Sequence, residues 1–276
     1  MRSMINESTN QVNQNGADSS SSGRRRETAW EKWNRLCAGG CFCAVIPQEL
    51  MWRICDTQTP QGILCVARQP HYELEEILEG TVVQTSGVLS PEIAAQTSGM
   101  PSPGIAVQIS GLGGSDRAGR FAPPPLLLLL EDIQDPGNLG TMIRTAEAAG
   151  VTGIVMSRGT VDVFNPKTVR ATMSALFRMP FFCAEDFVGT LGRIREKGIA
   201  IYAAHLEGAR SYESCSYIEG TALLIGNEGN GLSDEAASAA DYRIILPMRG
   251  RIESLNAAVA ASVLLYEADR QRRMTE

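Results

Sequence analysis

Short apolar runs alternate with amphipathic stretches over residues 126–276. Each apolar run has the length of a strand, and most stretches between runs are long enough for a helix. This alternation is typical of βαβ units, in which helices cover both faces of a parallel sheet. We therefore predict an α/β domain over 126–276, with a parallel sheet flanked by helices. The predicted strands span 126–131, 152–156, 179–183, 199–204, 221–225 and 243–246.

The helices of this domain have recognisable ends. Residues with N-cap side chains precede three predicted helices, at Asn165 (followed by Pro166), Asp186 and Ser233. The second of these helices is expected to close at Gly198, since glycine commonly follows a helix end. A last helix is predicted over 254–272, and the arginines near its end suit the negative end of its dipole.

The first 125 residues differ in composition. Residues 1–28 are rich in Asn, Gln, Ser and Gly, which bury too little apolar surface to offset the entropy of ordering, so we predict a disordered polar tail over 1–35. Its Arg24–Arg26 triplet is either solvated or an RNA contact. The pattern of residues 36–80 predicts a small partial α/β domain, with strands at 42–46 and 62–67 and a helix at 47–55. Residues 81–125 contain a twelve-residue repeat rich in Gly, Ser and Pro, which predicts a flexible linker.

Charge and hydropathy narrow the function classes. The formal net charge of −6 argues against binding nucleic acid through an overall basic field, although a local basic site remains open. Of the 25 cationic residues 22 are arginines, which favour bidentate phosphate contacts, but a GC-rich genome would give the same bias. No apolar run approaches the ~18 residues of a membrane span, so we expect a cytoplasmic chain without a membrane segment.

The cysteines and histidines give no clear metal site. Cys37, Cys41 and Cys43 lie one residue short of the C-x3-C-x2-C spacing that holds iron–sulfur clusters in radical enzymes, and the same segment fits a strand. His71 and His205 are too far apart for a zinc site with the usual local spacing. We therefore predict no metal, with reduced thiols in a chain that has no export signal.

Polar and glycine residues follow three of the predicted strands, where ligands bind in open α/β sheets. The first such loop runs from Asp132 to Gly140 and leads into a helix that contains Arg144. Asn138, at the start of that helix, can cap backbone donors while its amide faces a ligand. Arg144 either faces a ligand or forms an exposed i,i+3 ion pair with Glu147.

The second loop, Gly226–Gly231, has the order G-x-x-G-x-G, which matches neither a dinucleotide loop nor a phosphate loop. Glu228 in this loop would repel a phosphate. Its carboxylate either accepts hydrogen bonds from the hydroxyl or amino groups of a ligand, or lies at a glycine-rich helix N-terminus and favours its dipole.

The third loop, Leu246–Asn256, leads into the last helix. Arg249 and Arg251 flank a glycine there and are candidate contacts to RNA phosphates. Ser254 has a simpler role open to it, as the N-cap of the last helix.

The three loops together resemble motifs one, two and three of the SpoU (TrmH) family, within the SPOUT class of RNA methyltransferases. The matching residues are Asp135-Pro-Gly-Asn138-Leu-Gly140 with Arg144, Gly226-Asn-Glu228-Gly229, and Leu246-Pro-Met248 through Ser254-Leu255-Asn256. They stand in the family's order and spacing and cover about residues 126–276.

This resemblance implies a deep trefoil knot at the C-terminal end of the sheet, an exception to the rule that chains avoid threading. S-adenosyl-L-methionine is expected to bind in the knot, held by the chain around Ala204, Leu206, Gly226, Leu246, Met248 and Leu255. Members of the family act as homodimers and methylate a ribose 2′-hydroxyl of ribosomal or transfer RNA. For this chain we expect ribosomal RNA as the partner.

The same resemblance implies a catalytic site made of Arg144, Asn138, Glu228, Ser254 and Asn256, with Arg144 facing the RNA. A guanidinium stays charged in proteins, so Arg144 is a poor general base. We expect it to hold phosphate or to stabilise the developing alkoxide. The proton would then pass to the RNA phosphate, water or a neighbouring residue.

Two departures from the family keep an alternative open. Residues 37–78 resemble the end of the family's ribosomal-protein-like RNA-binding domain, whose opening half has no counterpart in residues 1–35. In addition, Ser174 stands where the family usually has glycine. The alternative is a knotted RNA-binding protein, or a truncated family member, without productive catalysis.

Overall fold

The computed structural model of this 276-residue chain describes residues 46–55, 66, 69–79, 124–206 and 210–275. From Gln48 onward, these residues belong to one compact unit. Several predictions concern segments that lie wholly or almost wholly outside the described residues. They are the tail 1–35, the strands at 42–46 and 62–67, the cysteine cluster 37–43 and the repeat linker 81–125.

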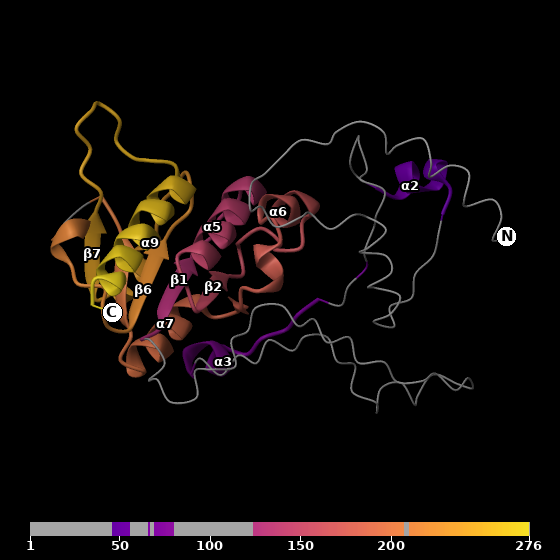
Figure 1. The fold of residues 1–276 in the computed structure, drawn as a ribbon. Helices are drawn as coiled ribbons and strands as arrows, with labels where there is room; N and C mark the ends of the chain where they lie inside the picture. The colour runs from indigo at the N-terminus through magenta and orange to yellow at the C-terminus, as the bar shows by residue number, and fades with distance from the viewer. Residues whose placement is uncertain (1–45, 56–65, 67–68, 80–123, 207–209, 276) are drawn as a thin grey trace, which may run out of the picture. The chain divides into compact units, whose positions relative to one another are not determined.

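Seven parallel strands form a single sheet in the order β3-β2-β1-β6-β4-β7-β5 (Figure 1). Their bounds are β1 Leu126–Leu130, β2 Gly153–Ser157, β3 Phe181–Ala184, β4 Ala200–Ala204, β5 Arg210–Ser211, β6 Thr221–Ile225 and β7 Tyr242–Ile245. The predicted parallel α/β fold is therefore confirmed, and each strand predicted within residues 126–276 is present within two residues of its expected ends. The sequence did not predict β5, because two residues are too short for a recognisable alternation.

Strand β1 explains why the sheet has two buried faces. All five of its leucines are at most 1% exposed. Leu126, Leu128 and Leu130 belong to one hydrophobic core, and Leu127 and Leu129 belong to the core on the other face. Because successive side chains in a strand point to opposite faces, an unbroken apolar run requires a covering layer on each side.

Helices supply those two layers. Residues of α5 and α9 complete the first core, and residues of α3, α7 and α8 complete the second. The helical bounds are α2 Gln48–Ile54, α3 Leu74–Glu79, α5 Pro136–Ala148, α6 Pro166–Ala171, η1 Ala175–Phe177, α7 Phe187–Glu196, η2 Tyr212–Ser214, α8 Asp234–Ala239 and α9 Ala257–Arg273. None of the helices within the described ranges is long and apolar enough to cross a bilayer.

The predicted N-caps at Asn165, Asp186 and Ser233 are confirmed, since each side chain accepts a hydrogen bond from a backbone N–H of the first turn. The prediction for the last helix was wrong at its start. Helix α9 begins at Ala257, and Asn256 rather than Ser254 is its N-cap, because Asn256 Oδ1 accepts from two backbone N–H groups of the first turn.

Helix α3 packs on the sheet although the sequence assigns it to the N-terminal domain. Leu74 and Ile77 are almost fully buried in the second core. Ile77 also occupies the space that a side chain on Gly153 would need, so glycine permits this contact. Ion pairs of Glu75 with Arg193 and of Glu79 with Lys197 flank the helix. Residues 74–79 are thus part of the compact unit formed around the sheet.

Candidate active site

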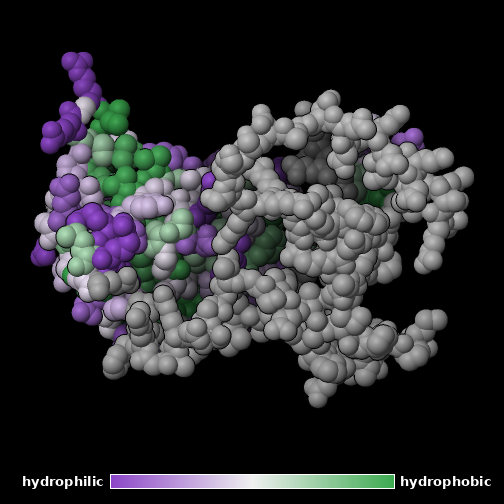
Figure 2. All heavy atoms as spheres, viewed as in Figure 1, coloured by the Kyte–Doolittle hydropathy of each residue, from purple (hydrophilic) through white to green (hydrophobic). Residues whose placement is uncertain are grey.

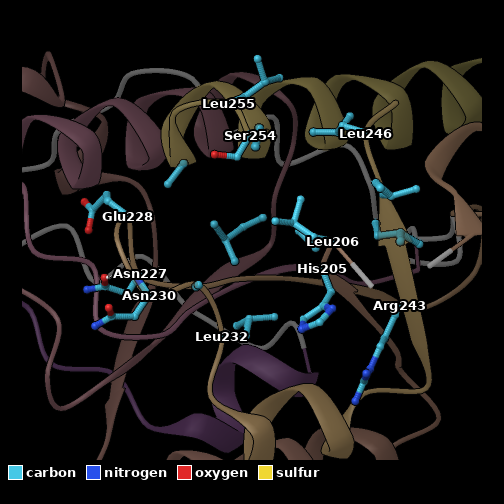
Figure 3. A pocket seen from close by; sticks show the side chains of 18 of the residues that line it. His205, Leu206, Asn227, Glu228, Asn230, Leu232, Arg243, Leu246, Ser254 and Leu255 are labelled. Carbon is cyan, nitrogen blue, oxygen red and sulfur yellow. Dashed lines mark hydrogen bonds between the residues drawn. The ribbon is translucent and has the colours of Figure 1, made fainter. Parts of the chain in front are cut away.

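A cavity of about 540 Å³ lies beyond the carboxyl ends of β4, β6 and β7 (Figure 3). This volume falls within the ~300–1,000 Å³ range of small-molecule sites. Three segments line it, the ends of β4, β6 and β7 with the loops that follow them, and the first turns of α9 close it. The cavity therefore lies where open α/β sheets bind ligands.

All six residues that the family resemblance implied for cofactor binding line this cavity. They are Ala204, Leu206, Gly226, Leu246, Met248 and Leu255. Figure 3 shows Asn227, Glu228 and Asn230 along one side of the cavity and Leu206 and His205 on the other. One wall is thus polar and the other carries an apolar side chain, an arrangement that suits a ligand with both kinds of surface.

The loop after β6 folds tightly back on itself. Asn227 and Gly231 exchange two backbone hydrogen bonds, at 2.9 and 3.0 Å. A Cβ on Gly226 would collide with the backbone of Gly231 and Leu232, so only glycine fits there. The alternative of a helix N-terminus for this loop is wrong, because the segment forms this turn and α8 begins only at Asp234.

Asn227 fixes this loop against the end of β1. Its Oδ1 accepts from the backbone N–H groups of Gly229 and Asn230, and its Nδ2 donates to the carbonyl of Asp132 at 2.7 Å. Asp132 has a φ of 52°, in the left-handed region that non-glycine residues seldom adopt. Sequence reasoning missed both residues; the Asn-x-Gly spacing signals the turn at Asn227, whereas nothing local signals Asp132.

A chain of side-chain hydrogen bonds joins the three loops. Asn256 Nδ2 donates to Asn138 Oδ1 at 3.1 Å, and Asn138 Nδ2 donates to Glu228 Oε1 at 3.0 Å. The amide orientations follow from the helix cap, because Asn256 Oδ1 already accepts from the backbone of α9 and leaves only Nδ2 to donate. Residues 90 and 118 positions apart in the sequence thus meet in one network.

Two further donors hold Glu228. The backbone N–H of Gln134 donates to its Oε2 at 3.0 Å, and the backbone N–H of Asp135 donates to its Oε1 at 3.1 Å. Partial desolvation acts to raise the pKa of Glu228, but the hydrogen bonds from Asn138, Gln134 and Asp135 outweigh it and keep this pKa below its ordinary value. Glu228 is therefore a fixed carboxylate at neutral pH and a weaker base than an ordinary glutamate.

Asn138 does not cap α5, contrary to the sequence-based expectation. Asp135 is the N-cap, because its Oδ1 accepts from the backbone N–H of Asn138 at 2.8 Å. The side chain of Asn138 is thereby free for the network with Glu228 and Asn256. A hydrogen bond from the backbone N–H of Asn138 and the Lys167 ammonium lower the pKa of Asp135.

Arg144 lies on α5 and is exposed, outside the lining of the cavity. The alternative of an ion pair with Glu147 is wrong, because Glu147 Oε1 accepts from Arg178 Nε at 2.7 Å instead. Within the described part of the chain, Arg144 makes no hydrogen bond or ion pair. Its guanidinium is therefore available for a partner outside the chain.

The remaining candidates lie on the loop between β7 and α9. Ser254 lines the cavity and is exposed. Arg249 and Arg251 are also exposed, and the loop between β7 and α9 that carries them projects from the body of the molecule (Figure 1). Figure 2 shows the outer end of this projection as hydrophilic. The structure thus separates the two arginines from the cavity wall and presents them to solvent.

We expect Glu228→Gln to lower the free energy of unfolding by about 0.5–1 kcal/mol at neutral pH, a size typical of exposed charged interactions. The reason is that the amide NH2 group would face N–H donors that now meet a carboxylate oxygen. The difference should shrink in acid, because a carboxyl with a lowered pKa stabilises the fold above its ordinary pKa and stops doing so as the pH falls through the lowered value.

Urea denaturation of both proteins between neutral pH and about pH 3.5 measures this difference. Glu185→Gln is the matched control, since Glu185 is exposed and has no hydrogen bond among the described residues. A gap between wild type and Glu228→Gln that stayed constant down to the acid end would contradict the role given to the carboxylate.

Comparison with known proteins identifies the family of this chain. Residues 125–266 match the model of the SpoU rRNA Methylase family, which is more than half of the chain. The chain belongs to the SpoU rRNA methylase family. The match spans the sheet and all three loops of the candidate site, so the resemblance of the three motifs is confirmed.

One curated relative is the 23S rRNA (guanosine(2553)-2′-O)-methyltransferase RlmP of Bacillus subtilis (strain 168). It is 39% identical over 140 residues, which are 51% of this chain and 56% of RlmP. The chain therefore spans little more than half of the length of this family member. An uncharacterized tRNA/rRNA methyltransferase of Synechocystis is 34% identical over 154 residues, again covering 56% of that protein.

Solved structures of the family share the fold. The SpoU methyltransferase AviRb from Streptomyces viridochromogenes has a TM-score of 0.53 at 32% identity, covering 56% of this chain and 62% of AviRb. An AdoMet-bound rRNA methyltransferase from Sinorhizobium meliloti has a TM-score of 0.51 at 40% identity, covering 54% of this chain and 57% of that protein.

Proposed function

We propose that this chain transfers a methyl group from S-adenosyl-L-methionine to a ribose 2′-hydroxyl of ribosomal RNA. The observation that carries the proposal is the network of Asn138, Glu228 and Asn256, which joins all three family motifs beside one cavity. The names of two relatives agree with it, since RlmP is a 23S rRNA 2′-O-methyltransferase and the Sinorhizobium protein was crystallised with AdoMet.

The residues of the cavity fit S-adenosyl-L-methionine. The absence of a side chain at Gly226 lets the backbone of Gly231 and Leu232 pack directly against it, and this closely folded backbone lines the cavity. Leu206, Leu246 and Leu255 offer apolar surface to a flat base, and the polar wall around Asn227 suits hydroxyl and amino groups. When bound, the cofactor supplies a methyl group on a sulfonium, which needs an aligned rather than a strong nucleophile.

The side chains of this site position the reaction. Holding the 2′-hydroxyl in line with the methyl group could supply much of ~7–11 kcal/mol of barrier reduction. The hydrogen bonds among Glu228, Asn138 and Asn256 hold the three loops in fixed positions relative to one another, as this alignment requires. Ser254 forms part of the cavity lining. Because the pKa of Glu228 is lowered, we assign the proton of the 2′-hydroxyl to the RNA phosphate, to water or to another residue.

Arg144 has the RNA-facing role in this proposal. A guanidinium cannot act as a base at neutral pH, but its planar fork suits a phosphate or a developing alkoxide. It is exposed on α5 and has no partner among the residues that the structure describes, which supports a role that is fulfilled only when RNA binds. Arg249 and Arg251 on the projecting loop would add phosphate contacts, which position RNA without reading its sequence.

The proposal includes a threaded chain in the region of the cavity, a trefoil knot, as the family resemblance implies. The tight fold of residues 226–232 and the return of the chain from β7 past the same cavity are consistent with it. A cytoplasmic location belongs to the same proposal, because the RNA substrate is found there.

We also propose that the chain acts as a homodimer through α9. Val259 and Tyr266, two turns apart on one side of this helix, are each 49% exposed, an unusual state for apolar side chains on a helix that otherwise packs in the core.

We expect Tyr266→Glu to convert the dimer into a monomer, because burying an unpaired charge in an interface is costly. Light scattering after gel filtration measures the mass. Met274→Glu, on an exposed side chain at the helix end, should leave the dimer intact.

Tritiated methyl transfer to total RNA from a methylation-deficient strain tests the function. We expect label to enter the RNA only when S-adenosyl-L-methionine is supplied. After alkaline hydrolysis the label should remain in uncleaved dinucleotides, because a 2′-O-methyl group protects the adjacent phosphodiester bond. Label on a base would contradict the ribose assignment. Cofactor and RNA binding without any transfer would favour the alternative, a knotted RNA-binding protein without productive catalysis.

A further inference from the structure

Two large apolar side chains are presented to solvent between α6 and β3. Met173 is 65% exposed and Phe177 is 59% exposed, while their neighbours Thr172, Ala175 and Leu176 are buried. The three buried neighbours therefore hold the segment against the body of the protein, and only these two apolar side chains of the segment are exposed. Apolar side chains of this size are usually turned inward when a neighbouring core is available.

The backbone that presents them is held in an uncommon conformation. Met173 has a φ of 49° and Ser174 a φ of 74°, both in the left-handed region that favours glycine. Backbone hydrogen bonds from Phe177 N–H to the Ser174 carbonyl at 3.2 Å and from Ala175 N–H to the Thr172 carbonyl at 3.0 Å close the turn. The φ of Ser174 also explains why the family usually has glycine here. Uncommon conformations of this kind concentrate at functional sites.

This turn lies beside Arg144. Gly140, Arg144 and Glu147 form one stripe on α5, because residues three and four apart share a helix face. The Gly140 end of the stripe meets α6, where a Cβ on Gly140 would collide with Ala171. At the other end Glu147 pairs with Arg178, directly after η1. Figure 1 shows α5 and α6 side by side, as their contacts require.

The charge around the pair suits a polyanion. Arg144 is exposed and unpaired among the described residues, and Arg170 and Arg178 are exposed on the same segment. The nearby carboxylates of Glu147 and Asp135 are already paired with Arg178 and Lys167. The segment that carries the apolar pair therefore has exposed arginines on it, and the carboxylates of Glu147 and Asp135 at the two ends of the adjoining α5 are compensated by ion pairs.

A nucleobase fits this surface better than a second protein chain. Two side chains are far short of the about 800 Å² that each partner contributes to a standard interface. They match the face of a single base, and proteins that bind single-stranded RNA stack bases on aromatic side chains beside phosphate-binding cations.

We propose that Phe177, with Met173 beside it, stacks on an unpaired nucleobase next to the nucleotide that Arg144 contacts. This inference rests on the proposed function and narrows its substrate to RNA whose target nucleotide lies in a single-stranded segment. A fully paired duplex would keep its bases stacked on one another and could not use this surface.

Binding of a fluorescein-labelled single-stranded 12-nucleotide RNA of mixed sequence to the full chain, followed by anisotropy, tests the proposal. We expect Phe177→Ala to weaken binding about fivefold or more, as for loss of one base–aromatic stack. Phe177→Trp should restore it. Binding of the same RNA annealed to its complement should not change. Val188→Ala, at an exposed apolar side chain on α7, is the matched control and should bind like wild type.

Two results would overturn the inference. One is equal binding of the single-stranded RNA by Phe177→Ala and wild type; the other is a change in mass of Phe177→Ala in light scattering, which would assign the surface to a second copy. Because Phe177 is exposed, its replacement should leave the melting temperature unchanged. Failure of the proposed function can be told apart from failure of this inference. In the first case the wild-type protein would transfer no methyl group, while Phe177→Ala would still weaken RNA binding.

Discussion

Replacing Gly226 with alanine is expected to lower the affinity for S-adenosyl-L-methionine at least about tenfold and to lower the free energy of unfolding by about 1–3 kcal/mol. The added Cβ would meet backbone atoms of Gly231 and Leu232, which cannot turn aside as a flexible side chain can. The loop from 226 to 232 would have to open, and with it the wall of the cavity. Calorimetric titration of the cofactor and urea denaturation measure the two effects.

Gly192→Ala provides the matched control. A Cβ at Gly192 meets nothing within 4 Å, and the residue lies inside α7. Alanine there should stabilise the protein by about 0.5–1 kcal/mol through its higher helix propensity and should leave cofactor affinity unchanged. If Gly226→Ala bound the cofactor as wild type does, the assignment of this cavity to the cofactor would be wrong.

Arg144→Lys is expected to reduce methyl transfer about 100-fold or more, the size of effect seen when one donor to a developing oxyanion is lost. Lysine keeps the charge but not the planar fork of donors. The affinity for S-adenosyl-L-methionine should not change, because Arg144 does not line the cavity. Single-turnover methyl transfer and calorimetric titration separate the two steps.

Arg193→Lys is the control for this substitution. Arg193 lies on α7 and pairs with Glu75, away from the three loops of the site. Its replacement should leave methyl transfer unchanged within about twofold, since exposed ion pairs contribute about 0–1 kcal/mol to stability and nothing to the site. If Arg144→Lys turned over at a rate close to that of wild type, a single positive charge would suffice and the planar guanidinium with its several N–H donors would have no role.

The residues of the site were predicted more accurately from the sequence than the residues that cap the helices beside it. All six residues that the family resemblance implied for the cofactor line one cavity, because they lie at or after the carboxyl ends of parallel strands that meet at one edge of the sheet. The patterns gave the wrong N-cap for α9 and an incorrect capping role to Asn138. In both cases two polar residues near a helix start could serve as the cap, and only the path of the chain selects between them.

By itself the sequence determined the parallel α/β fold, most helix starts and the family of this chain. These features depend on residues close together in the chain, on apolar periodicity, on caps and on short motifs. The tertiary structure alone decided that Asn138, Glu228 and Asn256 form one network, that Asp132 adopts a left-handed conformation, and that Arg144 stands outside the cavity. The physical reason is that each of these depends on packing between segments as much as 118 positions apart, which no local preference encodes.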